Sequence, residues 1–283
     1  MQKDNSEYYR LPRNFHKTFI PERQYINAML RFAASGGIGN YQDIASKTCI
    51  PMGNSSGKVP SILDYCKGMG LVKLNSRFKK GIKKPELTSF GRTVLLNDPF
   101  LKERVTQWIA HLNLCSPIFG ADVWYYTFLK GSHELGVSFQ REDLTRYLAL
   151  IYQVNRSNLI GPLIRMYQDE GSFCICNVLS ESLGIITRKK APITDEFGLA
   201  YGAWILQLMG DHFPHNNQIS VKDLDDKAGW RLIPRWNTFD ANKVLELIQR
   251  KGIIEVDRTM NPWLLQATKV TDEAWKKIYD DLI

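Results

Sequence analysis

The chain has 283 residues, 44% of them hydrophobic, so it can bury a sizeable core and is not expected to be disordered overall. It contains no run of about 18 apolar residues, and its first residues lack the apolar core of a secretory signal, so we expect a cytoplasmic protein without membrane spans. The five cysteines are odd in number and widely spaced, which excludes the pattern of a disulfide-rich secreted scaffold.

The net charge of +8 is concentrated at one end of the chain. Residues 1–100 contain 16 Lys and Arg against 7 Asp and Glu, which leaves 21 against 22 for the remainder. Clustered cations can displace the counterions condensed on a phosphate backbone. The charge alone fits a polyanion-binding surface or a solubilising face equally well.

The first hundred residues predict three helices followed by a basic ribbon. Apolar residues recur at helical spacing up to a stop at Gly36-Gly37, and Pro60 fits the first turn of a third helix. This order is typical of a winged helix-turn-helix. The three expected helices are residues 24–34, 41–45 and one that begins near Pro60 and ends at Gly68 or Gly70. Strands at 71–74 and 85–88, joined by a basic stretch, lead into a further helix at 90–96.

The same order recurs near the C-terminus, where Gly252-Ile253 echoes Gly70-Leu71. The intervening residues predict amphipathic helices and one short hairpin within residues 173–187. We therefore predict a mainly α fold with small β-ribbons, in which winged-helix-like modules flank a helical body. The predicted domains are 1–98 (winged-helix, DNA-binding), 99–213 (helical, central) and 214–283 (winged-helix-like).

Two groups of residues in the N-terminal module are candidates for nucleic-acid contact. The third helix would read the major groove with residues near its start, and the basic ribbon would lie along the backbone or in the minor groove. The alternative is a solvated basic loop. The candidates are Asn54, Ser55, Ser56, Lys58 and Ser61 on the helix, and Arg77, Lys79, Lys80, Lys83 and Lys84 on the ribbon.

The equivalent C-terminal loop, residues 257–262, has little excess charge and predicts a structural or protein-contact role. Metal and catalytic motifs are sparse throughout. Cys174 and Cys176 would share one face of a strand, but no second pair stands at finger-like spacing, so we expect no structural zinc. A metal-dependent phosphodiesterase would need carboxylates around Mg²⁺ or Mn²⁺, and the spacing of the acids selects none.

Several motifs resemble one family. The resemblance spans most of the chain and is densest between residues 13 and 150. It is to the domain-of-unknown-function family encoded beside the sulfur-transfer genes of bacterial DNA phosphorothioation, with SspB-type subunits as its best-described members. The family's opening motif reads Gly-His-Glu-Thr-Phe, whereas Phe15 and Lys17 replace its Gly and Glu here. The motifs are Phe15-His16-Lys17-Thr18-Phe19, Leu87-Thr88-Ser89-Phe90-Gly91, Trp108-Ile109-Ala110-His111 and Ala121-Asp122-Val123-Trp124.

The resemblance implies a DNA-binding, strand-nicking subunit of a phosphorothioate modification and phage-defence system. The implied partners are double-stranded DNA and the sulfur-transfer and ATPase subunits of such a system, and a homodimer is left open. It also makes His16 a candidate catalytic residue, because this histidine falls on a polar position of the family's opening motif. Two alternatives are a non-catalytic subunit that recruits the complex to DNA and a winged-helix transcriptional regulator.

Overall fold

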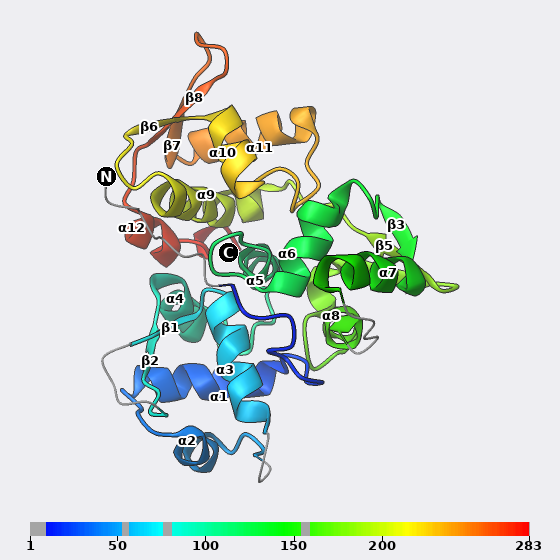
Figure 1. Ribbon diagram of the computed structural model, residues 1–283. Helices are drawn as coiled ribbons and strands as arrows, with labels where there is room; N and C mark the ends of the chain where they lie inside the picture. The colour runs from blue at the N-terminus through cyan, green and yellow to red at the C-terminus, as the bar shows by residue number, and fades with distance from the viewer. Residues whose placement is uncertain (1–9, 53–56, 76–80, 154–158, 283) are drawn as a thin grey trace, which may run out of the picture.

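A computed structural model describes residues 10–52, 57–75, 81–153 and 159–282. The described chain is mainly helical with small antiparallel sheets, as the sequence predicted (Figure 1). None of its helices combines the length and the apolar character needed to cross a membrane.

The N-terminal unit follows the predicted order of helices and strands. Asn40 starts the second helix because its side chain accepts the Asp43 amide, while the Asp43 carboxylate accepts the Asn40 amide at 2.9 Å. A backbone bridge between Gly39 and Lys83 extends the two-stranded ribbon by one further pairing. The elements are α1 (Arg23–Ala34), α2 (Tyr41–Thr48), α3 (Lys58–Gly68), β1 (Val72–Leu74), β2 (Pro85–Leu87) and α4 (Ser89–Asn97).

The C-terminal unit has the same order with a fuller sheet. Its strands lie in the order β6-β8-β7, all antiparallel, and the β7–β8 hairpin projects from the molecule (Figure 1). The first of these strands was not predicted from the sequence. The elements are α9 (Gly198–His212), β6 (Gln218–Ser220), α10 (Val221–Ala228), α11 (Thr238–Arg250), β7 (Ile254–Asp257), β8 (Leu264–Ala267) and α12 (Thr271–Lys276).

The two units share a hydrogen-bonded joint after their third helices. Gly70 and Gly252 adopt positive φ angles of 72° and 67°, which glycine tolerates because it has no Cβ. The hydroxyl of Thr88 donates to the Gly70 carbonyl at 2.6 Å, and that of Thr268 donates to the Gly252 carbonyl at 2.8 Å. The echo seen in the sequence is therefore realised as the same local structure.

The middle of the chain differs from the predicted helical body, because it contains a third sheet. Its strands lie in the order β3-β5-β4, and the sequence of helix, strand, helix, helix, strand, strand matches that of the C-terminal unit. The elements are α5 (Arg104–Leu114), α6 (Asp122–Phe128), β3 (Ser138–Gln140), α7 (Arg141–Tyr152), α8 (Ile160–Met166), β4 (Leu179–Ser182) and β5 (Ile185–Arg188), with short 3-10 helices at Lys130–Ser132, Cys174–Cys176, Asp195–Phe197 and Asp280–Leu282.

The predicted hairpin within residues 173–187 is shifted, and Cys174 and Cys176 do not lie on a strand. They belong to a 3-10 turn. In this turn the Cys176 amide donates to the Gln107 side chain on α5 at 3.0 Å, and its thiol donates to the Phe173 carbonyl at 3.0 Å. The prediction that the two thiols share one face of a strand was therefore wrong.

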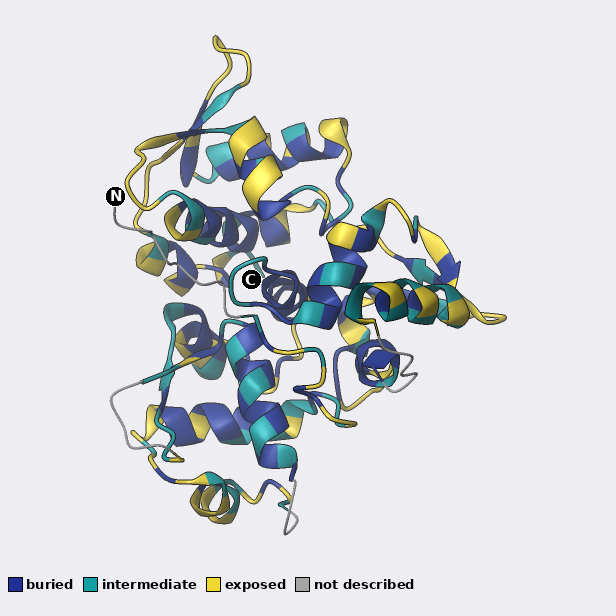
Figure 2. Cartoon of the chain, viewed as in Figure 1, coloured by how far each residue is buried: buried dark blue, intermediate teal, exposed yellow. Residues whose placement is uncertain are grey.

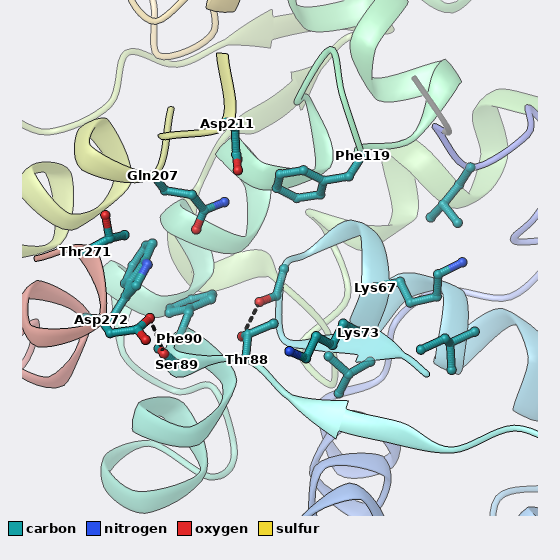
Figure 3. A pocket seen from close by; sticks show the side chains of 15 residues that line it. Lys67, Lys73, Thr88, Ser89, Phe90, Phe119, Gln207, Asp211, Thr271 and Asp272 are labelled. Carbon is teal, nitrogen blue, oxygen red and sulfur yellow. Dashed lines mark hydrogen bonds between the residues drawn. The ribbon is translucent and has the colours of Figure 1, made fainter. Parts of the chain in front are cut away.

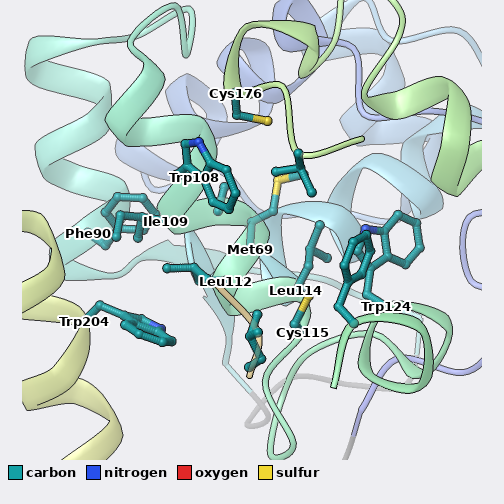
Figure 4. Close-up of a cluster of buried hydrophobic side chains, with 14 of the residues drawn as sticks. Met69, Phe90, Trp108, Ile109, Leu112, Leu114, Cys115, Trp124, Cys176 and Trp204 are labelled. Carbon is teal, nitrogen blue, oxygen red and sulfur yellow. The ribbon is translucent and has the colours of Figure 1, made fainter. Parts of the chain in front are cut away.

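Helix α5 lies at the centre of the molecule and is buried from Val105 to Leu114 (Figure 2). It packs on α3 of the N-terminal unit and on α9 of the C-terminal unit. Its own Trp108 lies in a cluster of buried side chains that also includes Trp124 from α6 and Trp204 from α9 (Figure 4). Each of these three side chains is at most 1% exposed, so the three rings pack in the core. The predicted division into three domains remains a prediction, although α9 packs on α10, α11 and α12.

Candidate nucleic-acid interface

The structure describes only part of the predicted interface. Lys58, Ser61, Lys83 and Lys84 are described. The other six candidates, Asn54, Ser55, Ser56, Arg77, Lys79 and Lys80, lie outside the described residues.

Helix α3 offers only a narrow surface along its described length. It packs on α1, α2 and α5, and its half-buried side chains past the first turn are Asp64 and Lys67, whose charged groups lie 3.6 Å apart. Ser61 is completely buried, and its hydroxyl donates to the Phe15 carbonyl at 3.2 Å. The predicted approach of Ser61 to DNA is therefore corrected, because this side chain belongs to the core.

Lys58 is held by neighbouring groups at the start of α3. Its ammonium lies 2.5 Å from the Glu22 carboxylate and 4.5 Å from the centre of the Tyr25 ring. A cation placed over an aromatic face and beside a carboxylate has its charge largely satisfied. The sequence made Lys58 a candidate for DNA contact, whereas the structure shows it joining α3 to α1.

Three lysines lie at the described base of the ribbon. Lys73 is exposed on β1, and Lys83 and Lys84 precede β2. Glu86 is the carboxylate on the facing strand: it pairs with Lys73 across the ribbon and lies 3.5 Å from the Lys84 ammonium. A hydrogen bond from Asn75 and the nearby lysines hold the pKa of Glu86 below its usual value. The ribbon base thus keeps an excess of positive charge at neutral pH.

A second cationic feature lies in a groove of about 590 Å³ between α1 and α2. Arg31 and Lys47 line it, together with the Phe32 ring and Gly36-Gly37, and no carboxylate is among the described residues that line it. Sequence reasoning missed these two cations. Each stands in the last turn of its helix, α1 or α2.

His16 is buried in a cluster of aromatic rings. Its Nδ1 donates to the Lys17 carbonyl at 2.9 Å, and its ring meets those of Phe15 and Trp124. Burial lowers the pKa of His16 to about 4, so the imidazole is neutral at pH 7. A side chain that is 1% exposed cannot reach a phosphodiester in this conformation, so the structure gives His16 a packing role.

The described side chains do not fit a metal ion held by the protein alone. Within the described ranges, no three His, Cys, Asp or Glu side chains gather closely enough to hold one. Two carboxylates of this part of the chain form ion pairs instead: Asp122 pairs with Arg10 at 2.7 Å, and Glu181 pairs with Arg141 at 2.6 Å. Magnesium usually binds through one or two carboxylates, water and substrate phosphates. The expected Mg²⁺ or Mn²⁺ site therefore has no protein cage in this part of the chain.

Comparison with known proteins agrees with the resemblance that the motifs indicated. Residues 15–161 match the family described as "Protein of unknown function (DUF4007)". The fold is similar to a magnesium ion-bound SspB crystal structure, with a TM-score of 0.68 and 14% identity over 99% of this chain and 91% of that chain. A second SspB crystal structure gives a TM-score of 0.67 and 14% identity over 95% and 88% of the two chains. A search of curated proteins found no match.

Proposed function

The chain belongs to the DUF4007 family, and from its cationic N-terminal unit we propose that it binds double-stranded DNA within a phosphorothioate modification and defence system. The family resemblance supports a role in such a system, in which sulfur-transfer and ATPase subunits would be the partners of this chain. The fold likeness to SspB supports the same placement. The role that the geometry favours is recruitment of the complex to DNA.

Positive charge is concentrated on two neighbouring parts of the N-terminal unit, and DNA binding is proposed from this concentration. The ribbon base carries Lys73, Lys83 and Lys84 against Glu86, and the groove between α1 and α2 adds Arg31 and Lys47 without a carboxylate. Three helices followed by a ribbon are the arrangement expected of a winged-helix module, whose wing contacts the DNA backbone. Contacts of this kind bind phosphates with little dependence on base sequence.

A salt titration tests DNA binding directly. We expect a short duplex to bind with an affinity that falls steeply with salt, and the Lys73→Ala, Lys83→Ala, Lys84→Ala triple variant to lower the log–log slope by up to roughly 3. A matched control removes Lys269, Lys276 and Lys277, which are exposed at the other end of the chain. Equal losses in the two triple variants, or no binding at low salt, would refute the proposal.

Strand nicking is the second candidate function, and the likeness to a magnesium-bound SspB structure favours it. Among the described residues no three possible ligands gather, so a metal ion would need ligands from the substrate or from water as well. Incubation with supercoiled plasmid and Mg²⁺ or Mn²⁺ separates the two roles. Open-circular product would establish nicking, whereas binding without product would favour recruitment. Selection of a defined operator from random oligonucleotides would instead indicate a transcriptional regulator.

A further inference from the structure

A cleft of about 460 Å³ opens where the N-terminal unit meets α9 and α12 (Figure 3). Phe90 on α4 and Trp275 on α12 form an apolar floor, with ring centres 4.8 Å apart. The Ser89 hydroxyl donates to the Asp272 carboxylate at 2.6 Å and fastens the same two helices together. The cleft is therefore a fixed feature of the packing between α4 and α12.

The walls of the cleft carry three kinds of group. Phe119, in the loop between α5 and α6, is half-exposed and turns its ring toward the cavity (Figure 3). Gln207 and Asp211 stand one turn apart on α9 and line the same side of the cleft. Lys67 and Lys73 line the opposite side.

These groups match the parts of a nucleotide. A half-exposed aromatic ring can stack on the flat face of any base. The amide of Gln207 both donates and accepts hydrogen bonds, and the Asp211 carboxylate accepts them, so together they suit a base edge. The exposed Lys73 suits a phosphate, and Lys67, whose ammonium lies 3.6 Å from the Asp64 carboxylate, adds a second cation on the same side. The cavity volume lies within the range of about 300–1,000 Å³ that is usual for small-ligand sites.

We propose that this cleft binds a nucleotide, with its base against Phe119 and its phosphate beside Lys67 and Lys73. Lys73 also belongs to the ribbon base, so the cleft adjoins the surface proposed for DNA. The nucleotide could therefore come from bound DNA, as a base turned out of the stack, or from a free mononucleotide. Only the first source rests on the proposed function.

Titration of the full chain with dAMP, and separately with deoxyadenosine, tests the cleft by calorimetry. We expect saturable binding of dAMP, weakened at least tenfold by Phe119→Ala, and weaker binding of deoxyadenosine because it lacks the phosphate. Gln207→Ala provides a second variant in case Phe119→Ala perturbs folding, which thermal melting would reveal. Phe100→Ala is the matched control, because this exposed ring lies outside the cleft.

A pair of duplexes distinguishes the two sources. One is fully paired, and the other contains a single unpaired 2-aminopurine. Preference for the unpaired duplex that Phe119→Ala abolishes supports a base turned out of DNA, and binding of dAMP alone supports a free nucleotide. The proposal is overturned if neither probe binds in a Phe119-dependent manner. If duplex binding persists in that case, the proposed function is still supported. If dAMP binds but no duplex does, the proposed function is refuted and the proposal of a nucleotide site in the cleft is retained.

Discussion

Among single residues, the structure distinguishes cations that contact other side chains inside the fold from cations that remain exposed to a ligand such as DNA. Lys58 and Lys83 illustrate the difference. The ammonium of Lys58 contacts Glu22 and the Tyr25 ring, whereas Lys83 lies on the ribbon 5.8 Å from the centre of the Tyr41 ring, with no ion pair found for it among the described residues. Sequence position alone could not make this distinction.

Lys58→Ala should therefore reduce stability more than DNA affinity. The half-buried pair with Glu22 and the contact with the Tyr25 ring should together contribute about 1–2 kcal/mol to the free energy of unfolding. Urea denaturation and duplex binding by fluorescence anisotropy measure the two effects on the same samples. Lys83→Ala is the comparison, with the opposite balance expected. A loss of affinity in Lys58→Ala at unchanged stability would restore this lysine to the interface.

His16 should make the protein sensitive to acid. In the unfolded chain His16 binds a proton near pH 6.5, whereas in the folded chain its pKa is about 4. The stability that comes from keeping His16 neutral is therefore complete above pH 6.5, and it is lost as the pH falls toward 4. The loss between pH 7 and pH 5 should be about 2 kcal/mol. Urea unfolding of His16→Gln should show a correspondingly shallower dependence on pH. Parallel curves for the two proteins would mean that His16 is hydrated in solution.

At the scale of elements, the sequence predicted the longer helices and the terminal ribbons because apolar spacing and glycine stops are local signals. It missed β3 and β6, which have three residues each and gain their identity only from their partners in the sheets. One local signal was available. In each unit, the residue just before one helix is followed three positions later by an Asp that accepts a hydrogen bond from it. The pairs are Asn40 with Asp43, Gln140 with Asp143 and Ser220 with Asp223.

The candidate site was less predictable than the fold. The excess of charge located the N-terminal unit, but the burial of Ser61 depends on α1 and α5 closing over α3, which no local pattern reports. The cleft brings Lys73, Phe119 and Gln207 together from three separate stretches of chain. Such a site exists only in the folded molecule.

The joint shared by the N- and C-terminal units predicts that the bond from the threonine hydroxyl to the glycine carbonyl contributes equally to stability in both units. Thr88→Val and Thr268→Val each remove a hydroxyl that donates to a glycine carbonyl, so each should destabilise the protein by about 1 kcal/mol. Thr88 also caps α4 through the Gly91 amide, which should add up to roughly 1 kcal/mol at that site. Thermal unfolding of both variants, with Thr→Ser as the conservative rescue, measures the difference. A harmless Thr268→Val would show that the joint is not energetically equivalent in the two units.

At the scale of the whole molecule, the two ends of the chain are packed against each other. Helix α4 contacts α12, and buried α5 contacts elements of both terminal units. The three units of similar order therefore share a single core. The ribbon, the groove between α1 and α2, and the cleft are held in a fixed relation by that core.

This shared core predicts cooperative unfolding. Trp275→Ala removes a ring that is 2% exposed and packs on Phe90, so it should cost about 3–5 kcal/mol and lower the midpoint of the whole transition. Far-ultraviolet circular dichroism and tryptophan fluorescence should give coincident curves for the wild type and the variant. Ser89→Ala is the control at the same contact, where loss of one exposed hydrogen bond to Asp272 should cost about 1 kcal/mol or less. Two separate transitions in the wild type would instead mean that the terminal units unfold independently, and the cleft between them would then open without disturbing the cationic ribbon.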